Sequence, residues 1–101
     1  MLINNIEIIP SCMVKLIPIF DGNRRLINFY LGKCDYIYNL YKGTKEQDEY
    51  IFHVVTSRLT GDAAYVISER VDNIDTYYKF RKLMIQRFGN PYTEYAIKSP
   101  F

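Results

Sequence analysis

Apolar residues between Arg24 and Tyr41 recur with the period of an α-helix, and this stretch constrains the fold more than any other. Plotted at about 100° per residue, most of them fall on one arc about 140° wide. These are Leu26, Ile27, Tyr30, Leu31, Cys34, Ile37, Tyr38 and Tyr41. Phe29, Tyr36 and Leu40 form a second apolar ridge beside that arc. Either this is a central helix surrounded by its own domain, or the second ridge contacts another molecule.

A second helix is predicted to begin at Thr44. The run Thr44-Lys45-Glu46-Gln47 matches a capping box, in which the Thr and Gln side chains satisfy each other's free backbone amides. The inner face of this helix would consist of Ile51, Phe52, Val55 and Leu59. His53 falls on the opposite, polar face, so we interpret it as a solvated surface residue.

Two more helices are expected further along the chain. A short one begins after Thr60-Gly61, and the next begins at Asp75, whose side chain suits an N-cap. The latter helix places Tyr77, Phe80, Met84 and Phe88 on one face. It should end at Gly89, which tolerates a left-handed backbone, because Pro91 prevents any continuation.

The beginning of the chain does not have a helical pattern. Residues 2–20 are rich in Ile and Val and are interrupted by Pro10 and Pro18, which favours short strands or an extended arm. The apolar arm from Leu2 to Ile9 could pair as a strand with residues 13–19 of its own molecule or of a neighbour. We favour docking in the same molecule, beside the first helix and near Phe29, Tyr36 and Leu40. Asn23, after the turn at residues 21–22, is the expected N-cap of that helix.

Composition sets the class of protein. A chain of 101 residues with 49% apolar and 24% charged residues is long enough for one folded domain with its own core. The net charge of +2 is too small to indicate a nucleic-acid or membrane partner. No apolar run approaches the length of a membrane span, and the first residues lack the basic region of a secretion signal. We therefore expect a cytoplasmic protein that has no membrane partner.

No group of residues predicts catalysis or a cofactor. The chain lacks phosphate-binding glycine loops and the common hydrolase motifs, and Cys12, Cys34 and His53 are too scattered for a zinc site. Asp72 and Asp75 have no basic or metal-binding partner at a suitable spacing. We predict a non-enzyme without cofactors. Lys79, Lys82 and Arg87 make the last helix basic, which indicates either a solvated face or weak, non-specific contact with RNA.

Three blocks of the sequence resemble a known family. The segments are IPIFDGNRRLINFYLGKCD, VVTSRLTGDAAYVI and TYYKFRKLMIQRFGNPYTE, and they cover roughly residues 16–94 in this order. They are similar to the N-terminal lobe of the capsid region in Gag polyproteins of gypsy-type LTR retrotransposons, to which the domesticated Gag protein Arc is related. Tyr77 and Met84 depart from the pattern, where the family more often has Trp and Leu.

The resemblance implies a fold and a function. The fold would be a retroviral-capsid-like bundle of four to five helices with an extended N-terminal arm or short β-hairpin. The function would be structural, with lobes associating through helix faces into the shell of a virus-like particle that encloses RNA. As an alternative, an Arc-like adaptor would bind short peptides in a hydrophobic groove beside the N-terminal segment. The residues that we assign to this interface or groove are Ile17, Ile19, Phe20, Phe29, Tyr36 and Leu40.

The same resemblance suggests how the chain is divided. Residues 1–15 would form the arm, residues 16–94 the helical lobe, and residues 95–101 the start of a linker. In the family that linker leads to a second lobe. The chain would then be either an excised lobe or a shortened descendant of such a protein.

Overall fold

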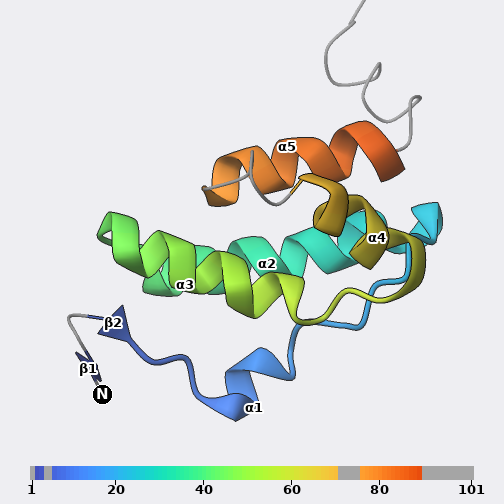
Figure 1. The fold of residues 1–101 in the computed structure, drawn as a ribbon. Coiled ribbons are helices and arrows are strands. Elements are labelled where there is room, and N and C mark those ends of the chain that lie inside the picture. The colour runs from blue at the N-terminus through green and yellow to red at the C-terminus, as the bar shows by residue number, and fades with distance from the viewer. Residues whose placement is uncertain (1, 4–5, 71–75, 90–101) are drawn as a thin grey trace, which may run out of the picture.

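A short extended segment is followed by a succession of helices, so the predicted all-α bundle with an N-terminal hairpin is confirmed. The computed structural model describes residues 2–3, 6–70 and 76–89. The first elements are strands β1 (Leu2–Ile3) and β2 (Ile6–Glu7), helix α1 (Ser11–Val14) and the 3₁₀ helix η1 (Arg24–Leu26). The longer helices are α2 (Ile27–Tyr41), α3 (Lys45–Thr56), α4 (Gly61–Arg70) and α5 (Tyr77–Phe88) (Figure 1).

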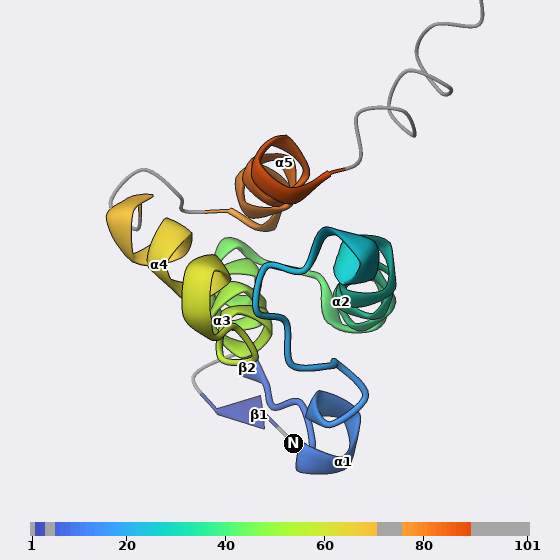
Figure 2. The same ribbon diagram turned by 90° about the vertical axis from the view of Figure 1, so that its right-hand side faces the viewer.

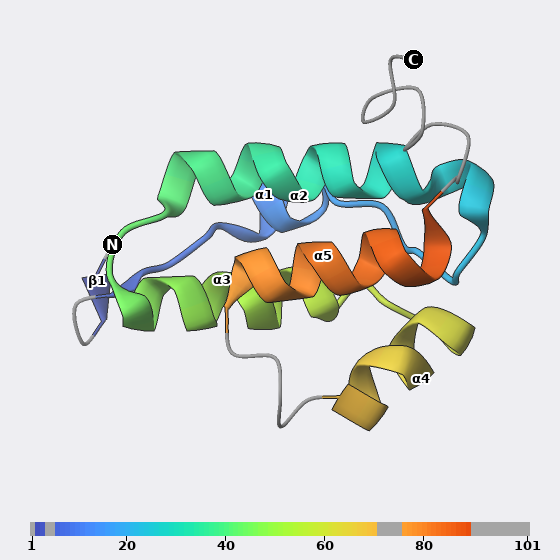
Figure 3. The same cartoon turned by 90° about the horizontal axis from the view of Figure 1, so that it is seen from above.

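Helices α2, α3 and α5 pack against one another around the core. Helices α2 and α3 run antiparallel, and α5 lies over the line between them (Figure 2). Helix α4 lies at the end where α3 and α5 finish (Figure 3). The largest fully buried side chains are Tyr30, Phe20, Phe80, Ile17, Ile27, Ile37, Ile51, Met84, Val55 and Cys34. No helix among the described residues has the length and apolar character needed to cross a membrane.

The start of the first long helix agrees with the prediction. The side chain of Asn23 accepts a hydrogen bond from the backbone N–H of Arg25 at 3.0 Å, as an N-cap does. The first turn, η1, has the tighter 3₁₀ geometry that is common at helix ends. Together η1 and α2 cover the predicted range from Arg24 to Tyr41.

The capping box of α3 is only half formed. Thr44 accepts a hydrogen bond from the backbone N–H of Gln47 at 3.1 Å, as predicted. The Gln47 side chain does not return to Thr44. Its amide oxygen instead accepts from the backbone N–H of Glu7 at 2.7 Å, and its amide nitrogen donates to the carbonyl oxygen of Glu7 at 3.0 Å. Gln47 therefore holds the arm, a role that its local sequence does not indicate.

Helix α5 ends at Gly89 as predicted, but its N-cap residue and the conformation of Gly89 differ from the prediction. The N-cap is Thr76, whose hydroxyl accepts from the backbone N–H of Lys79, while Asp72 and Asp75 lie outside the described residues. Gly89 is not left-handed, since its φ is −67°. A side chain there would overlap the carbonyl oxygen of Ile85, so lack of space rather than backbone conformation favours glycine at this position.

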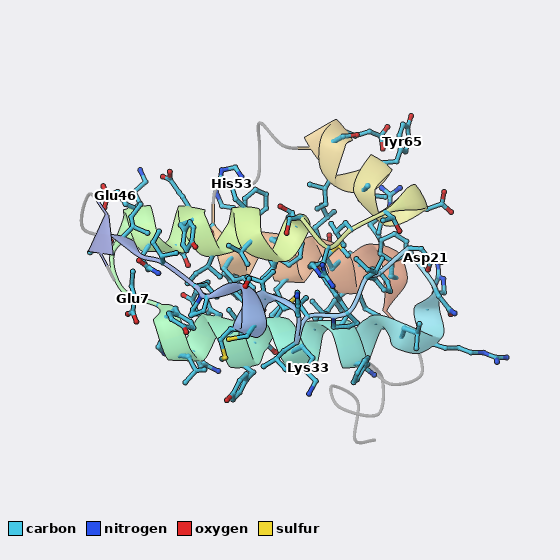
Figure 4. All side chains as sticks on the ribbon, turned by 90° about the horizontal axis from the view of Figure 1, so that it is seen from below. Glu7, Asp21, Lys33, Glu46, His53 and Tyr65 are labelled. Atoms are coloured by element: carbon cyan, nitrogen blue, oxygen red, sulfur yellow. The ribbon has the colours of Figure 1, made fainter. Side chains whose placement is uncertain are left out.

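The arm docks within its own molecule as predicted, but the predicted place is wrong. Strand β1 pairs with β2 rather than with residues 13–19, and Ser11–Val14 is helical. The arm lies against α3 and not beside Phe29, Tyr36 and Leu40. The backbone N–H of Ile9 donates to the Tyr50 hydroxyl at 2.9 Å, and the Ile9 side chain is buried. Figure 4 shows Glu7 near the first turn of α3, where Glu46 is labelled.

Replacing Gln47 by alanine should release the arm. Both hydrogen bonds to Glu7 would be lost, so the free energy of unfolding should fall by about 1–2 kcal/mol in urea titrations. The amide proton of Glu7 should also exchange faster with solvent. Gln86 is exposed on α5 and provides the control, because Gln86→Ala should change stability by less than about 0.5 kcal/mol. Equal effects of the two substitutions would contradict the role given to Gln47.

Candidate functional site

Helix α2 has one face in the core and another face that the described residues leave about half exposed. Tyr30, Cys34 and Ile37 are fully buried. The second ridge is open: the exposed fractions of the side chains are 56% for Phe29, 51% for Tyr36 and 52% for Leu40. Within the described part of the chain, the domain therefore does not surround this helix. The ridge is available to another molecule.

More apolar side chains extend this surface. Leu26 is exposed at the start of the helix, on the side of Phe29 and one turn before it. Leu16, also exposed, comes from the segment that follows α1. We call the surface formed by these residues and the helix positions between them the α2 face: Leu16, Leu26, Phe29, Gly32, Lys33, Tyr36 and Leu40.

A groove runs along the α2 face. Its volume is about 510 Å³, and Leu16 forms one wall while α2 forms the other. The helix contributes Asn28, Phe29, Gly32, Lys33 and Tyr36. The Lys33 ammonium lies 5.7 Å from the centroid of the Phe29 ring, within the range of a cation–π contact. Figure 4 places Lys33 at the edge of α2 that lies opposite α3. The groove is therefore apolar with one positive charge at its rim.

The structure divides the residues predicted for the interface. Phe29, Tyr36 and Leu40 lie together on the α2 face, and Ile19 is 51% exposed. Ile17 and Phe20 are fully buried, so they belong to the core and cannot contact a partner directly. The backbone N–H of Phe20 donates to the carbonyl oxygen of Arg58 at 2.9 Å, which keeps this segment against the end of α3. Leu16, Gly32 and Lys33 were not predicted as site residues.

A second, smaller hollow of about 330 Å³ lies where α2 meets α5. The Asp35 carboxylate accepts from Arg81 Nε at 2.9 Å and from the Tyr77 hydroxyl at 2.6 Å. Burial, followed by this hydrogen bond to Asp35, raises the pKa of Tyr77. These polar groups are already paired with one another. We interpret them as a connection between two helices rather than as a binding site.

Within the described part of the chain, the candidate reactive groups are not brought together. His53 is exposed on α3, and Cys12 is exposed on α1. Burial raises the pKa of the Cys34 thiol to about 12, so this thiol is not a nucleophile at neutral pH. Among the described residues, no group of three or more His, Cys, Asp or Glu side chains could hold a metal ion. Lys79, Lys82 and Arg87 are exposed on α5.

Comparisons with models of protein families, with curated proteins and with solved structures find no match to this chain. The assignment of a function therefore rests on the geometry of the site. The α2 face offers an apolar, partly aromatic surface with a shallow groove, and such a surface suits contact with another protein.

Polar substitutions on the α2 face should leave the fold intact. Tyr36→Gln and Leu40→Gln should each change the free energy of unfolding by less than about 0.5 kcal/mol, because both side chains already face solvent. Ile37 provides the control within the same helix, since it is fully buried. Ile37→Gln should cost about 3 kcal/mol or more, because an amide would enter the core. A large loss of stability from the first two changes would show that the face is covered in the native chain.

Proposed function

We propose that the chain is a non-enzymatic, capsid-like domain that associates with copies of itself through the α2 face. The single observation that supports this proposal is the line of exposed apolar side chains along one side of the central helix. Phe29, Tyr36 and Leu40 remain in water although the helix has a complete core face of its own. The resemblance to gypsy-type Gag capsid lobes supports the same function, since such lobes associate through helix faces.

The energetics of burial favour association at this face. Each square ångström of apolar surface removed from water contributes about 25 cal/mol. Aromatic side chains contribute the largest areas and are enriched where proteins contact one another. The exposed Tyr78 on α5 lines only the smaller hollow of about 330 Å³, whose Asp35, Tyr77 and Arg81 are already paired with one another. The groove on α2 is larger and mostly apolar. We therefore assign the interface to α2.

A second candidate function is peptide binding, and the groove supports it. Its volume of about 510 Å³ lies within the usual range for ligand sites. A short apolar peptide could lie between Leu16 and the helix, as in an Arc-like adaptor. This function requires the groove to be free, whereas self-association covers it.

Weak, non-specific binding of RNA by Lys79, Lys82 and Arg87 is the third candidate, and it should disappear at moderate salt.

The first two functions are separated by the behaviour of the chain in solution. We expect the average mass in sedimentation equilibrium to rise with protein concentration. Tyr36→Gln should weaken this association at least about tenfold, which is typical of an aromatic side chain at the centre of an interface. Tyr65→Gln, at an exposed position on α4, should leave it unchanged.

The opposite result would favour the adaptor. A chain that remains monomeric at millimolar concentration, and that binds apolar peptides in a way sensitive to Tyr36→Gln, would exclude self-association as the function of the α2 face.

A further inference from the structure

Gly32 occupies an unexpected position in the middle of α2 and on its exposed side. Glycine weakens a helix relative to alanine, because the unfolded chain has more freedom to lose. No contact among the described residues explains why a glycine that weakens the helix stands at this position. The backbone of Gly32 is not left-handed, and a side chain added there would meet no atom within 4 Å apart from the adjacent residues and the backbone of the helix itself. The space above Gly32 is open and forms part of the groove.

Phe29 lies three positions before Gly32 and projects from the same side of the helix. The α2 face thus carries a large projecting ring and, less than one turn away, a hollow floored by a residue without a side chain. Two copies of one surface can meet about a two-fold axis only if that surface is complementary to itself. A projection and a hollow side by side meet this condition.

We propose that two copies of the chain associate through an antiparallel pair of α2 helices, with Phe29 of each copy placed over Gly32 of the other. This inference rests on the proposed function and names its partner surface. Glycine allows the two backbones to approach closely enough for the ring to enter the hollow. Leu16, on the wall of the groove, would cover the edge of that ring.

The same register places a cation beside an aromatic ring in each half of the pair. Moving four residues forward from Gly32 reaches Tyr36, and moving four back from Phe29 reaches Arg25. Tyr36 of one copy therefore lies in the same layer as Arg25 of the other, where a cation–π contact can form. In this antiparallel arrangement Lys33 falls in the layer of Asn28 of the second copy, three positions from Arg25 and five from Lys33 of that copy. The positive rim of the groove thus does not oppose itself.

Gly32→Ala gives a test in which stability and association change in opposite directions. The thermal midpoint of the dilute monomer should rise by about 4 °C, because alanine favours the helix. The dissociation constant of the dimer should rise about tenfold, because the methyl group enters the hollow twice in each dimer. Gly32→Leu should fill the hollow and abolish association. Gln86→Leu, which adds the same side chain to an exposed site on α5, is the control and should not weaken it.

Disulfide trapping tests the register in a Cys12→Ser background. The chain with both Arg25→Cys and Tyr36→Cys should form a covalent dimer on mild oxidation. Within one copy these positions are about 16 Å apart along the helix, too far for a disulfide. Tyr36→Cys alone should not crosslink, because the two copies of this position are separated by a similar distance. Rapid crosslinking of Tyr36→Cys alone would indicate parallel helices or an antiparallel pair centred on Tyr36, and either result would overturn the proposed register.

The outcomes also separate this inference from the proposed function. If the unaltered chain associates and Gly32→Leu has no effect, the α2 pair is wrong while self-association through another surface stands. If the unaltered chain stays monomeric at millimolar concentration, both proposals fail. A monomer that binds apolar peptides would then support the adaptor.

Discussion

The packing of aromatic rings around Tyr30 joins parts of the chain that are far apart in sequence. Its ring stacks on Phe20 with the centroids 5.1 Å apart, and it forms a T-shaped contact with Phe80 from α5. Phe88 completes the group by meeting Phe20 edge-on at 5.4 Å. The Tyr30 hydroxyl donates a hydrogen bond to the carbonyl oxygen of Val55, so the one polar atom of this ring is satisfied inside the core. The segment before α2, α2 itself, α3 and α5 all depend on this cluster.

Because Tyr30 and its neighbours fix one side of α2, the opposite side of the helix has to point outward. In a three-helix arrangement each helix contacts two others, and a helix at the edge keeps an uncovered side. An uncovered side is normally polar, and here it carries Phe29, Tyr36 and Leu40 instead. The packing of the core explains why these residues face outward, but it does not explain why they are apolar. The apolar character of this exposed side is what indicates a partner.

Local patterns predicted most of the fold, and contacts between distant residues were largely beyond them. The spacing of Tyr77, Phe80, Met84 and Phe88 predicted the buried face of α5, since that pattern depends only on helix geometry. The role of Gln47 could not be predicted, because its partner Glu7 is 40 positions away. At the site, the second ridge of α2 was visible in the sequence as an apolar pattern. Gly32 was a signal that could have been used, since glycine inside a helix requires a reason.

The position of the arm determines how far the N-terminal segment can affect the groove. Residues 6–9 are held by Gln47 and Tyr50 on α3, away from the α2 face. Leu16 does line the groove, and its place is fixed separately, because Arg58 Nε donates to the carbonyl oxygen of the next residue, Ile17, at 2.9 Å. The arm is thus anchored on α3 itself, whereas the groove wall is anchored on Arg58, which lies just after the end of α3. Release of the arm from α3 would therefore leave Leu16 in its place beside the groove. The α2 face would then keep its shape for whichever molecule binds there.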